Sequence, residues 1–230
     1  MTVERGHRAW QVHVDGHLDA DQLAAELAPV AAGGGGPVFV WVSEPTVEDD
    51  VVAAGAGLTT GRDLYELRIP LPTKDAVPDL AWRPFEPGRD EAAWLDVNNR
   101  AFAWHPEQGG WTEAMLAERM TEPWFDPAGF LLTERDGKLA GFCWTKVHAD
   151  HDPPLGEIYV IAVDPDLHRS GLGKALTLAA LDWLHRERGI DVGMLYVDGS
   201  NAAGMALYEK LGFTPHHLDR AYAGEVPATR

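Results

Sequence analysis

Residues 156–176, GEIYVIAVDPDLHRSGLGKAL, limit the possible folds more than any other stretch of this sequence. An apolar run at 158–163 follows the single carboxylate of Glu157 and predicts a buried β-strand. After a turn, a loop with two glycines leads into a helix expected from Leu172 to about Arg188, because apolar residues recur there every four positions. A buried strand joined to a helix by such a loop is typical of α/β folds.

The loop between this strand and helix has the features of an anion-binding site. Free backbone N–H groups and the positive end of the helix dipole attract negative charge at a helix N-terminus. Gly171 and Gly173 leave room for a phosphate to approach the backbone, while Arg169 and Lys174 add positive charge. The loop matches neither GxxxxGK[ST] nor GxGxxG. Taken alone, two glycines at this spacing more often serve packing in a tight turn.

Alternating helices and strands are expected through the rest of the chain. Those expected before residue 75 are a helix at 20–32, a strand at 38–42, a helix at 47–58 and a strand at 63–71. Those expected after residue 88 are helices at 90–102 and 112–120, a hairpin at 129–147, a strand at 192–198, a helix at 201–211 and a last pair of strands at 213–223. Five prolines in residues 70–87 argue against regular structure and predict a linker.

An internal repeat is visible in this pattern. With a shift of 155 residues, 38–58 (VFVWVSEPTVEDDVVAAGAGL) aligns without a gap with 193–213 (GMLYVDGSNAAGMALYEKLGF). Trp41 then matches Tyr196, and duplication of an αβ unit would explain the pattern. In that case the N-terminal copy is only half a unit, because the residues before Ala20 leave no room for a hairpin, a central strand and a glycine loop.

The segment 195–213, LYVDGSNAAGMALYEKLGF, limits the possible functions of the candidate anion site. Asn201 is positioned to cap a helix, and Tyr208 lies two turns along that helix on the same face. In order and spacing, the glycine loop and this helix resemble the GCN5-related N-acetyltransferase (GNAT) family over roughly 82–222. The resemblance implies a GNAT fold of the α/β (α+β) class, with a mixed central β-sheet flanked by helices. A partial GNAT-like αβαβ half-domain would precede it here.

Four further stretches narrow the resemblance to one branch of the family: VNNRAFAWHPEQGGWT (97–112), EPWFDP (122–127), GFCWTKVHADH (141–151) and LGEIYVIAVDP (155–165). Enzymes of this branch complete the biosynthesis of the actinobacterial thiol mycothiol and contain two acetyltransferase-like domains, with catalysis in the second. This chain departs from the branch at Cys143, where we expect histidine, and before Trp82, where the branch has another glycine loop. The implied parts are a truncated GNAT-like half-domain without an acetyl-CoA loop at 1–75, a Pro-rich linker at 76–88 and a catalytic GNAT domain at 89–225.

The resemblance also implies acetyl-CoA as cosubstrate, no metal, and defined roles for individual residues. Glu157 is the expected general base and Tyr208 the expected general acid. The expected substrate contacts come from Glu107, Lys146, Glu157 and Tyr196. The expected acetyl-CoA contacts come from the strand end, the glycine loop and the next helix: Ile161, Ala162, Val163, His168, Arg169, Ser170, Gly171, Leu172, Gly173, Lys174, Asn201, Ala202, Ala203, Gly204, Met205 and Ala206. The family has Gln or Arg where this chain has His168, so we expect weakened rather than abolished binding.

The implied reaction is direct transfer of an acetyl group to the cysteinyl amine of cysteinyl-glucosaminyl-inositol. A base is needed because an alkyl ammonium is mostly protonated near neutral pH and must lose a proton before it attacks the thioester. Two alternatives stay open. One is an acetyltransferase for another small amine or a peptide N-terminus, and the other is a non-catalytic acyl-CoA-binding module.

The composition argues against several other classes of function. The formal net charge of -17 disfavours nucleic acid and an anionic membrane surface as partners. The single cysteine fits a reducing compartment, and the N-terminus has no apolar signal core, so a cytoplasmic protein is expected. The HxxH of His148 and His151 lacks the helical HExxH context, so no metal is expected. The uncovered edge of a half-sheet would favour a homodimer.

Overall fold

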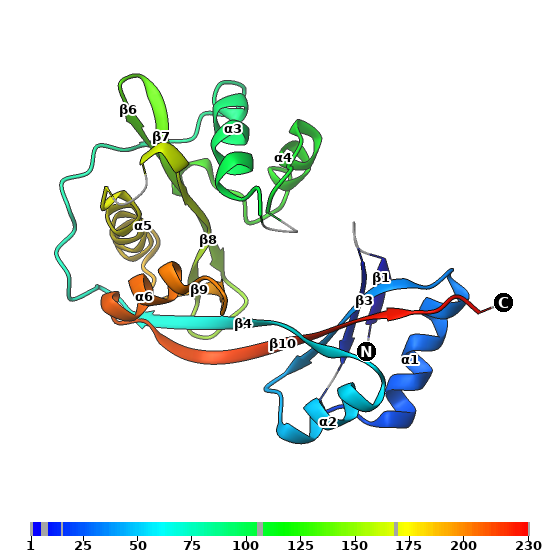
Figure 1. Ribbon diagram of the computed structural model, residues 1–230. Helices are drawn as coiled ribbons and strands as arrows, with labels where there is room; N and C mark the ends of the chain where they lie inside the picture. The colour runs from blue at the N-terminus through cyan, green and yellow to red at the C-terminus, as the bar shows by residue number, and fades with distance from the viewer. Residues whose placement is uncertain (1, 6–8, 15, 105–107, 168–169, 230) are drawn as a thin grey trace. The chain divides into compact units, whose positions relative to one another are not determined.

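The computed structural model describes residues 2–5, 9–14, 16–104, 108–167 and 170–229 (Figure 1). The chain forms two compact units. The first comprises Met1–Leu67, Val197–Ala206 and Pro215–Arg230, and the second comprises Arg68–Tyr196 and Leu207–Thr214. The first unit therefore combines the N-terminal part of the chain with two segments from its C-terminal part.

The first unit is a sheet with two helices. Its elements are β1 (Thr2–Arg5), β2 (Trp10–Val14), α1 (Ala20–Ala32), β3 (Gly36–Ser43), α2 (Val47–Gly55), β4 (Thr59–Pro70) and β10 (Thr214–Val226). The strand order is β1-β2-β3-β10-β4, and β2 and β3 are parallel whereas β3 and β10 are antiparallel. Alternate residues of a strand share one face, so Val12 and Val40 pack together against Leu23 of α1. Ala53 of α2 belongs to the same cluster.

The N-terminal segment contradicts the expectation that it leaves no room for a hairpin. β1 and β2 pair antiparallel, from Thr2 opposite His13 to Arg5 opposite Trp10. The prediction is wrong because five residues suffice for β2. Its sequence WQVHV alternates in polarity, and the strand buries Val12 and Val14 on one face.

The expected last pair of strands is also wrong. β10 is a single strand of 13 residues, which belongs to the second unit at Thr214 and to the first from Pro215 onward. Polar residues such as His216 and Asp219 interrupt its apolar alternation, so one long strand resembles two short ones. The predicted linker contains one short element, β5 (Arg83–Pro84), where Arg83 forms two hydrogen bonds with the Asp90 carboxylate.

The second unit has five strands in the order β9-β8-β7-β6-β5. Besides β5, its elements are α3 (Glu91–Ala101), α4 (Glu113–Arg119), η1 (Pro127–Gly129), β6 (Phe130–Arg135), β7 (Lys138–His148), β8 (Leu155–Val163), η2 (Pro165–Leu167), α5 (Leu172–Arg188), and most of β9 (Val192–Asp198) and half of α6 (Ala202–Leu211). The predicted hairpin is confirmed, with Asp136 and Gly137 both at positive φ between β6 and β7.

None of the helices described here is long and apolar enough to cross a bilayer.

Helices α3 and α5 pack on β7 and β8 (Figure 1). On one face, Trp94 of α3 is fully buried among aromatic rings, with Phe142 at 5.4 Å and Trp144 at 6.0 Å between ring centroids. On the other face, Gly141 lets α5 approach closely, because a Cβ there would lie 2.9 Å from Leu176. Strands β7 and β8 are therefore packed against a helix on each face of the sheet.

The structure supports the repeat found in the sequence. A shift of 155 residues carries β3, α2 and β4 onto β9, α6 and β10, and every first and last residue agrees within one position. The order β1–β2–α1–β3–α2–β4 also repeats the order β7–β8–α5–β9–α6–β10. The N-terminal copy is therefore more than the half unit that was expected, because it contains the hairpin, the central strand and the crossover helix.

Asp49 should make the stability of the first unit depend on pH. Its buried carboxylate accepts hydrogen bonds from the Leu18 N–H and from Thr46, with which it forms the capping box of α2. Burial opposes ionisation, but these hydrogen bonds outweigh it and lower the pKa of Asp49 from 3.8 to about 2. A lowered pKa in the folded state contributes about 2 kcal/mol above pH 4, which is lost as the pH falls from about 4 to about 2. Asp49→Asn should therefore lower the free energy of unfolding at neutral pH and flatten its pH dependence in urea titrations.

The exposed neighbour Glu48 provides the control, because it carries the same charge in the first turn of α2 without this network. Glu48→Gln should change stability by only a few tenths of a kcal/mol. Equal flattening in both variants would contradict the role given to Asp49.

Candidate active site

Glu157 lies where β8 stops pairing with β9. The parallel pairing runs from Leu155 opposite Val192 to Glu157 opposite Met194. In the part of the chain that the structure describes, this pairing ends there, although β8 continues to Val163. Glu157 is only 5% exposed, so a carboxylate is buried beside a strand edge that β9 does not fill.

The carboxylate of Glu157 is held by His148, the last residue of β7. The two side chains form a hydrogen bond of 2.8 Å between Nε2 of His148 and Oε2 of Glu157. Lys146 lies directly opposite Glu157 and His148 opposite Leu155, so His148 and Glu157 are diagonal neighbours on one face of the sheet. His148 therefore fixes the orientation of the carboxylate.

Lys146 and Tyr159 extend this face into a cationic and aromatic surface. The ammonium of Lys146 lies 5.0 Å from the ring centroid of Trp124 and 5.9 Å from that of Tyr159. The guanidinium of Arg119 lies 5.9 Å from the Tyr159 ring. Burial, together with the negative charge of Glu157, raises the pKa of Tyr159 against the opposing effect of Arg119. The phenol of Tyr159 is therefore neutral at physiological pH.

The helix N-terminus of α5 is open. Gly171 occupies the N-cap position with φ of 80° and provides no side-chain cap, so no side chain of the described residues caps the first backbone N–H groups of α5. Gly173 has room for a side chain among the described residues, because a Cβ there would lie in ordinary contact with Val163 at 3.9 Å and Leu207 at 4.0 Å. Packing does not require a glycine at 173, which argues against the purely structural interpretation of the loop.

The N-terminus of the corresponding helix in the first unit, α1, is capped by a side chain. Asp19 is the N-cap of α1, and its carboxylate accepts hydrogen bonds from the N–H groups of Asp21 and Gln22. An internal carboxylate thus occupies the position at which a phosphate would bind to α5. This contrast agrees with the absence of a glycine loop from the N-terminal copy.

Tyr208 of α6 is 8% exposed and packs edge-to-face on Phe213, with 5.5 Å between ring centroids. Burial, with a smaller contribution from Cys143, raises the pKa of Tyr208 well above its usual value of 10. The phenol is therefore protonated at physiological pH. Burial likewise raises the pKa of Cys143, whose thiol is fully enclosed and unsuited to nucleophilic attack.

The structure describes most of the other predicted site residues. Glu107, His168 and Arg169 lie outside the described residues. Lys174, expected to contact acetyl-CoA, forms an ion pair of 2.6 Å with Asp75. Asn201 caps α6 by accepting a hydrogen bond of 2.9 Å from the Gly204 N–H, as its position predicted. The segment Asn201 to Ala206 belongs to the first unit, whereas the remaining described residues of the predicted site belong to the second.

Sequence reasoning missed the contacts that surround Glu157. The sequence assigns no role to His148, Trp124 or Tyr159, which occur there only within longer matching stretches and, for His148, in an HxxH for which no metal is expected. The strand periodicity alone places Tyr159 on the same face as Glu157, since the two are separated by one residue. The position of Trp124, which comes from a loop, follows from no pattern in the sequence.

Comparison with known proteins identifies the family. The sequence profile of the acetyltransferase (GNAT) family matches residues 79–213. The mycothiol acetyltransferase of Thermobispora bispora is 52% identical over 203 residues, covering 85% of this chain and 68% of that protein. The mycothiol acetyltransferase of Acidimicrobium ferrooxidans is 45% identical over 235 residues, covering 99% of this chain and 74% of that protein. The chain thus spans about two thirds to three quarters of the length of these relatives.

Solved structures agree on the fold. A GCN5-related N-acetyltransferase from Sphaerobacter thermophilus has a TM-score of 0.70 at 22% identity, covering 90% of this chain and 65% of that one. A tandem GNAT protein from the clavulanic acid biosynthesis pathway has a TM-score of 0.66 at 15% identity, covering 91% of this chain and 70% of that one. The expected GNAT fold and the expected similarity to acetyltransferases of mycothiol biosynthesis are confirmed. The chain belongs to the acetyltransferase (GNAT) family.

Proposed function

We propose that this chain transfers the acetyl group of acetyl-CoA to the cysteinyl amine of cysteinyl-glucosaminyl-inositol, the last reaction of mycothiol biosynthesis. The buried Glu157, held by His148 beside the free edge of β8, is the observation that carries the chemistry. The names of the relatives carry the choice of substrate, because they are called mycothiol acetyltransferases.

In this proposal, Glu157 removes a proton from the substrate ammonium, directly or through one water. The neutral amine then attacks the thioester carbonyl, the new N–C bond forms, and the C–S bond breaks. His148 acts as a positioning residue, because its hydrogen bond leaves one carboxylate oxygen of Glu157 for the amine. Lys146 lies opposite Glu157 and provides a cation for the hydroxyl-rich part of the substrate.

Acetyl-CoA is proposed to bind along β8 and at the start of α5. GNAT acetyltransferases use it as cosubstrate, and its pyrophosphate suits the uncapped N–H groups after Gly171. The pantetheine amides can pair with the edge of β8 at residues 161–163, beyond the last pair with β9. Tyr208, whose phenol is protonated, would then supply a proton to the departing coenzyme A thiolate.

An acetyl-transfer assay on the purified protein tests the substrate. The cysteinylated pseudodisaccharide should be acetylated with release of coenzyme A, and a simple peptide amine of equal concentration should react far more slowly. Preference for the peptide amine would reject this substrate and favour the second candidate function, a GNAT enzyme for another amine. Binding of acetyl-CoA without turnover on any amine would indicate a non-catalytic acyl-CoA-binding module.

The remaining expectations are proposals of the same kind. We propose that catalysis belongs to residues 89–225, that the N-terminal part binds no acetyl-CoA, and that the protein works in the cytoplasm. β1 is an edge strand of the first unit and offers a surface for a homodimer. Light scattering that detects only monomers at high protein concentration would reject the dimer.

A further inference from the structure

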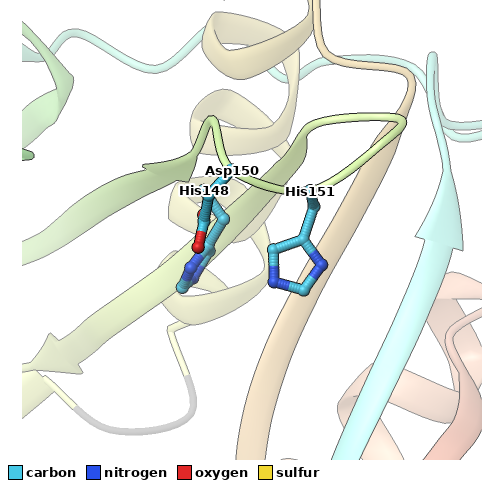
Figure 2. Close-up of side chains that lie close together, drawn as sticks. All are labelled: His148, Asp150 and His151. Atoms are coloured by element: carbon cyan, nitrogen blue, oxygen red, sulfur yellow. The ribbon is translucent and has the colours of Figure 1, made fainter.

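At the end of β7, three side chains gather that acetyl transfer does not require together. His148 ends the strand, and Asp150 and His151 follow in the next turn (Figure 2). Their candidate ligand atoms all lie within 4.8 Å of one another, and the two imidazole rings are 5.7 Å apart at their centroids. We propose that His148, Asp150 and His151 bind one divalent transition-metal ion of the zinc class.

The types of ligand at this cluster favour a zinc-class ion. Two imidazole nitrogens and one carboxylate oxygen are characteristic ligands of Zn²⁺, and water completes the tetrahedron in an open site. Metal–ligand bonds of about 2.0–2.1 Å place tetrahedral ligands about 3.3 Å apart, so the present spacing must contract by roughly 1.5 Å. Asp150 and His151 are exposed on a turn, where side-chain rotation achieves this without moving the sheet.

Glu157 provides a second and independent feature of such a site. Metal-bound histidines almost always direct their other ring nitrogen to a carboxylate or carbonyl, which fixes the tautomer. Nε2 of His148 already has this partner in Oε2 of Glu157 at 2.8 Å. Nδ1 of His148 is then the nitrogen that can bind the metal, and the buried carboxylate orients the ring from behind.

The sequence argued against a catalytic zinc motif because HADH is not helical, and the structure agrees that these residues lie at a strand end and in a turn. The proposed ion therefore has another consequence, which rests on the proposed function. Once bound by His148, the ion places positive charge near Glu157, and this charge repels the substrate ammonium that must approach the base. Zinc should slow acetyl transfer.

Calorimetry with Zn²⁺ on the tag-free, chelator-treated full chain tests the site without reference to activity. One ion per chain is expected, and Asp150→Asn or His151→Ala should each weaken binding at least about tenfold. Asp152→Asn in the same turn and His216→Gln, an exposed histidine of the first unit, should leave binding unchanged. Absence of binding, or equal affinity in all four variants, would overturn the proposal.

Initial rates with and without Zn²⁺ test the consequence. Zinc should inhibit the wild-type protein, and a chelator should restore its activity. The His151→Ala variant should resist inhibition at the same acetyl-CoA and thiol concentrations. Equal inhibition of both would show that zinc acts through the substrate thiol, and would reject the coupling to Glu157. If no amine is acetylated, the proposed function fails while the calorimetry still decides on the metal site.

Discussion

Glu157→Gln should reduce kcat for acetyl transfer by about 10²- to 10⁴-fold, the contribution expected of a positioned general base. Glutamine has nearly the same size as glutamate, and its amide oxygen can still accept the hydrogen bond from His148. It cannot take a proton from the ammonium, so the substrate amine stays charged and does not attack. The fold and the affinity for acetyl-CoA should be preserved.

Steady-state kinetics and calorimetry with acetyl-CoA separate these effects. The exposed Glu187 on α5 provides the control, since Glu187→Gln removes the same charge from an exposed position of the second unit. Its kcat should match the wild type. A Glu157→Gln enzyme with normal kcat would remove Glu157 from the mechanism, whatever substrate is acetylated.

Gly173→Ala should weaken acetyl-CoA binding by roughly 10- to 150-fold, because one charge-assisted hydrogen bond between a backbone N–H and the pyrophosphate contributes about 1.5–3 kcal/mol. The added methyl group meets no atom of the described residues closer than 3.9 Å, so these residues leave room for it. Alanine is also the better helix former, by about 1 kcal/mol. The variant should therefore melt at the same or a higher temperature while it binds acetyl-CoA less well.

Gly55→Ala is the matched control, because Gly55 ends α2 and a Cβ there also meets nothing within 4 Å. It should raise the melting temperature without affecting acetyl-CoA. If Gly173→Ala destabilises the protein and leaves acetyl-CoA affinity unchanged, the glycine serves packing and the anion-site assignment is lost.

The sequence predicted the elements whose local signals are strong. Helix α1 begins and ends at the predicted residues, and the hairpin at Asp136 and Gly137 has the turn chemistry that its sequence requires. The strand β10 differs from the prediction of two strands because polar residues, among them His216 and Asp219, interrupt its apolar alternation. Local pattern cannot indicate which of two units a strand will join.

The sequence also predicted part of the candidate site. Glu157 and the glycine loop stand out because a buried carboxylate and an uncapped helix start are unusual in themselves. The bond between His148 and Glu157 depends on the register of β7 against β8, which includes a shift between Trp144 and Thr145. A bulge of this kind moves every later pair by one position, so the partner of Glu157 requires the structure.

The two helix starts indicate how a duplicated fold can lose a ligand and remain folded. A phosphate at a helix N-terminus provides the negative charge that the exposed N–H groups attract, and its loss leaves that end of the helix unsatisfied. In the first unit, Asp19 supplies the same charge from within the chain. A carboxylate of the chain itself thus satisfies the start of α1, so this helix needs no bound anion for its stability.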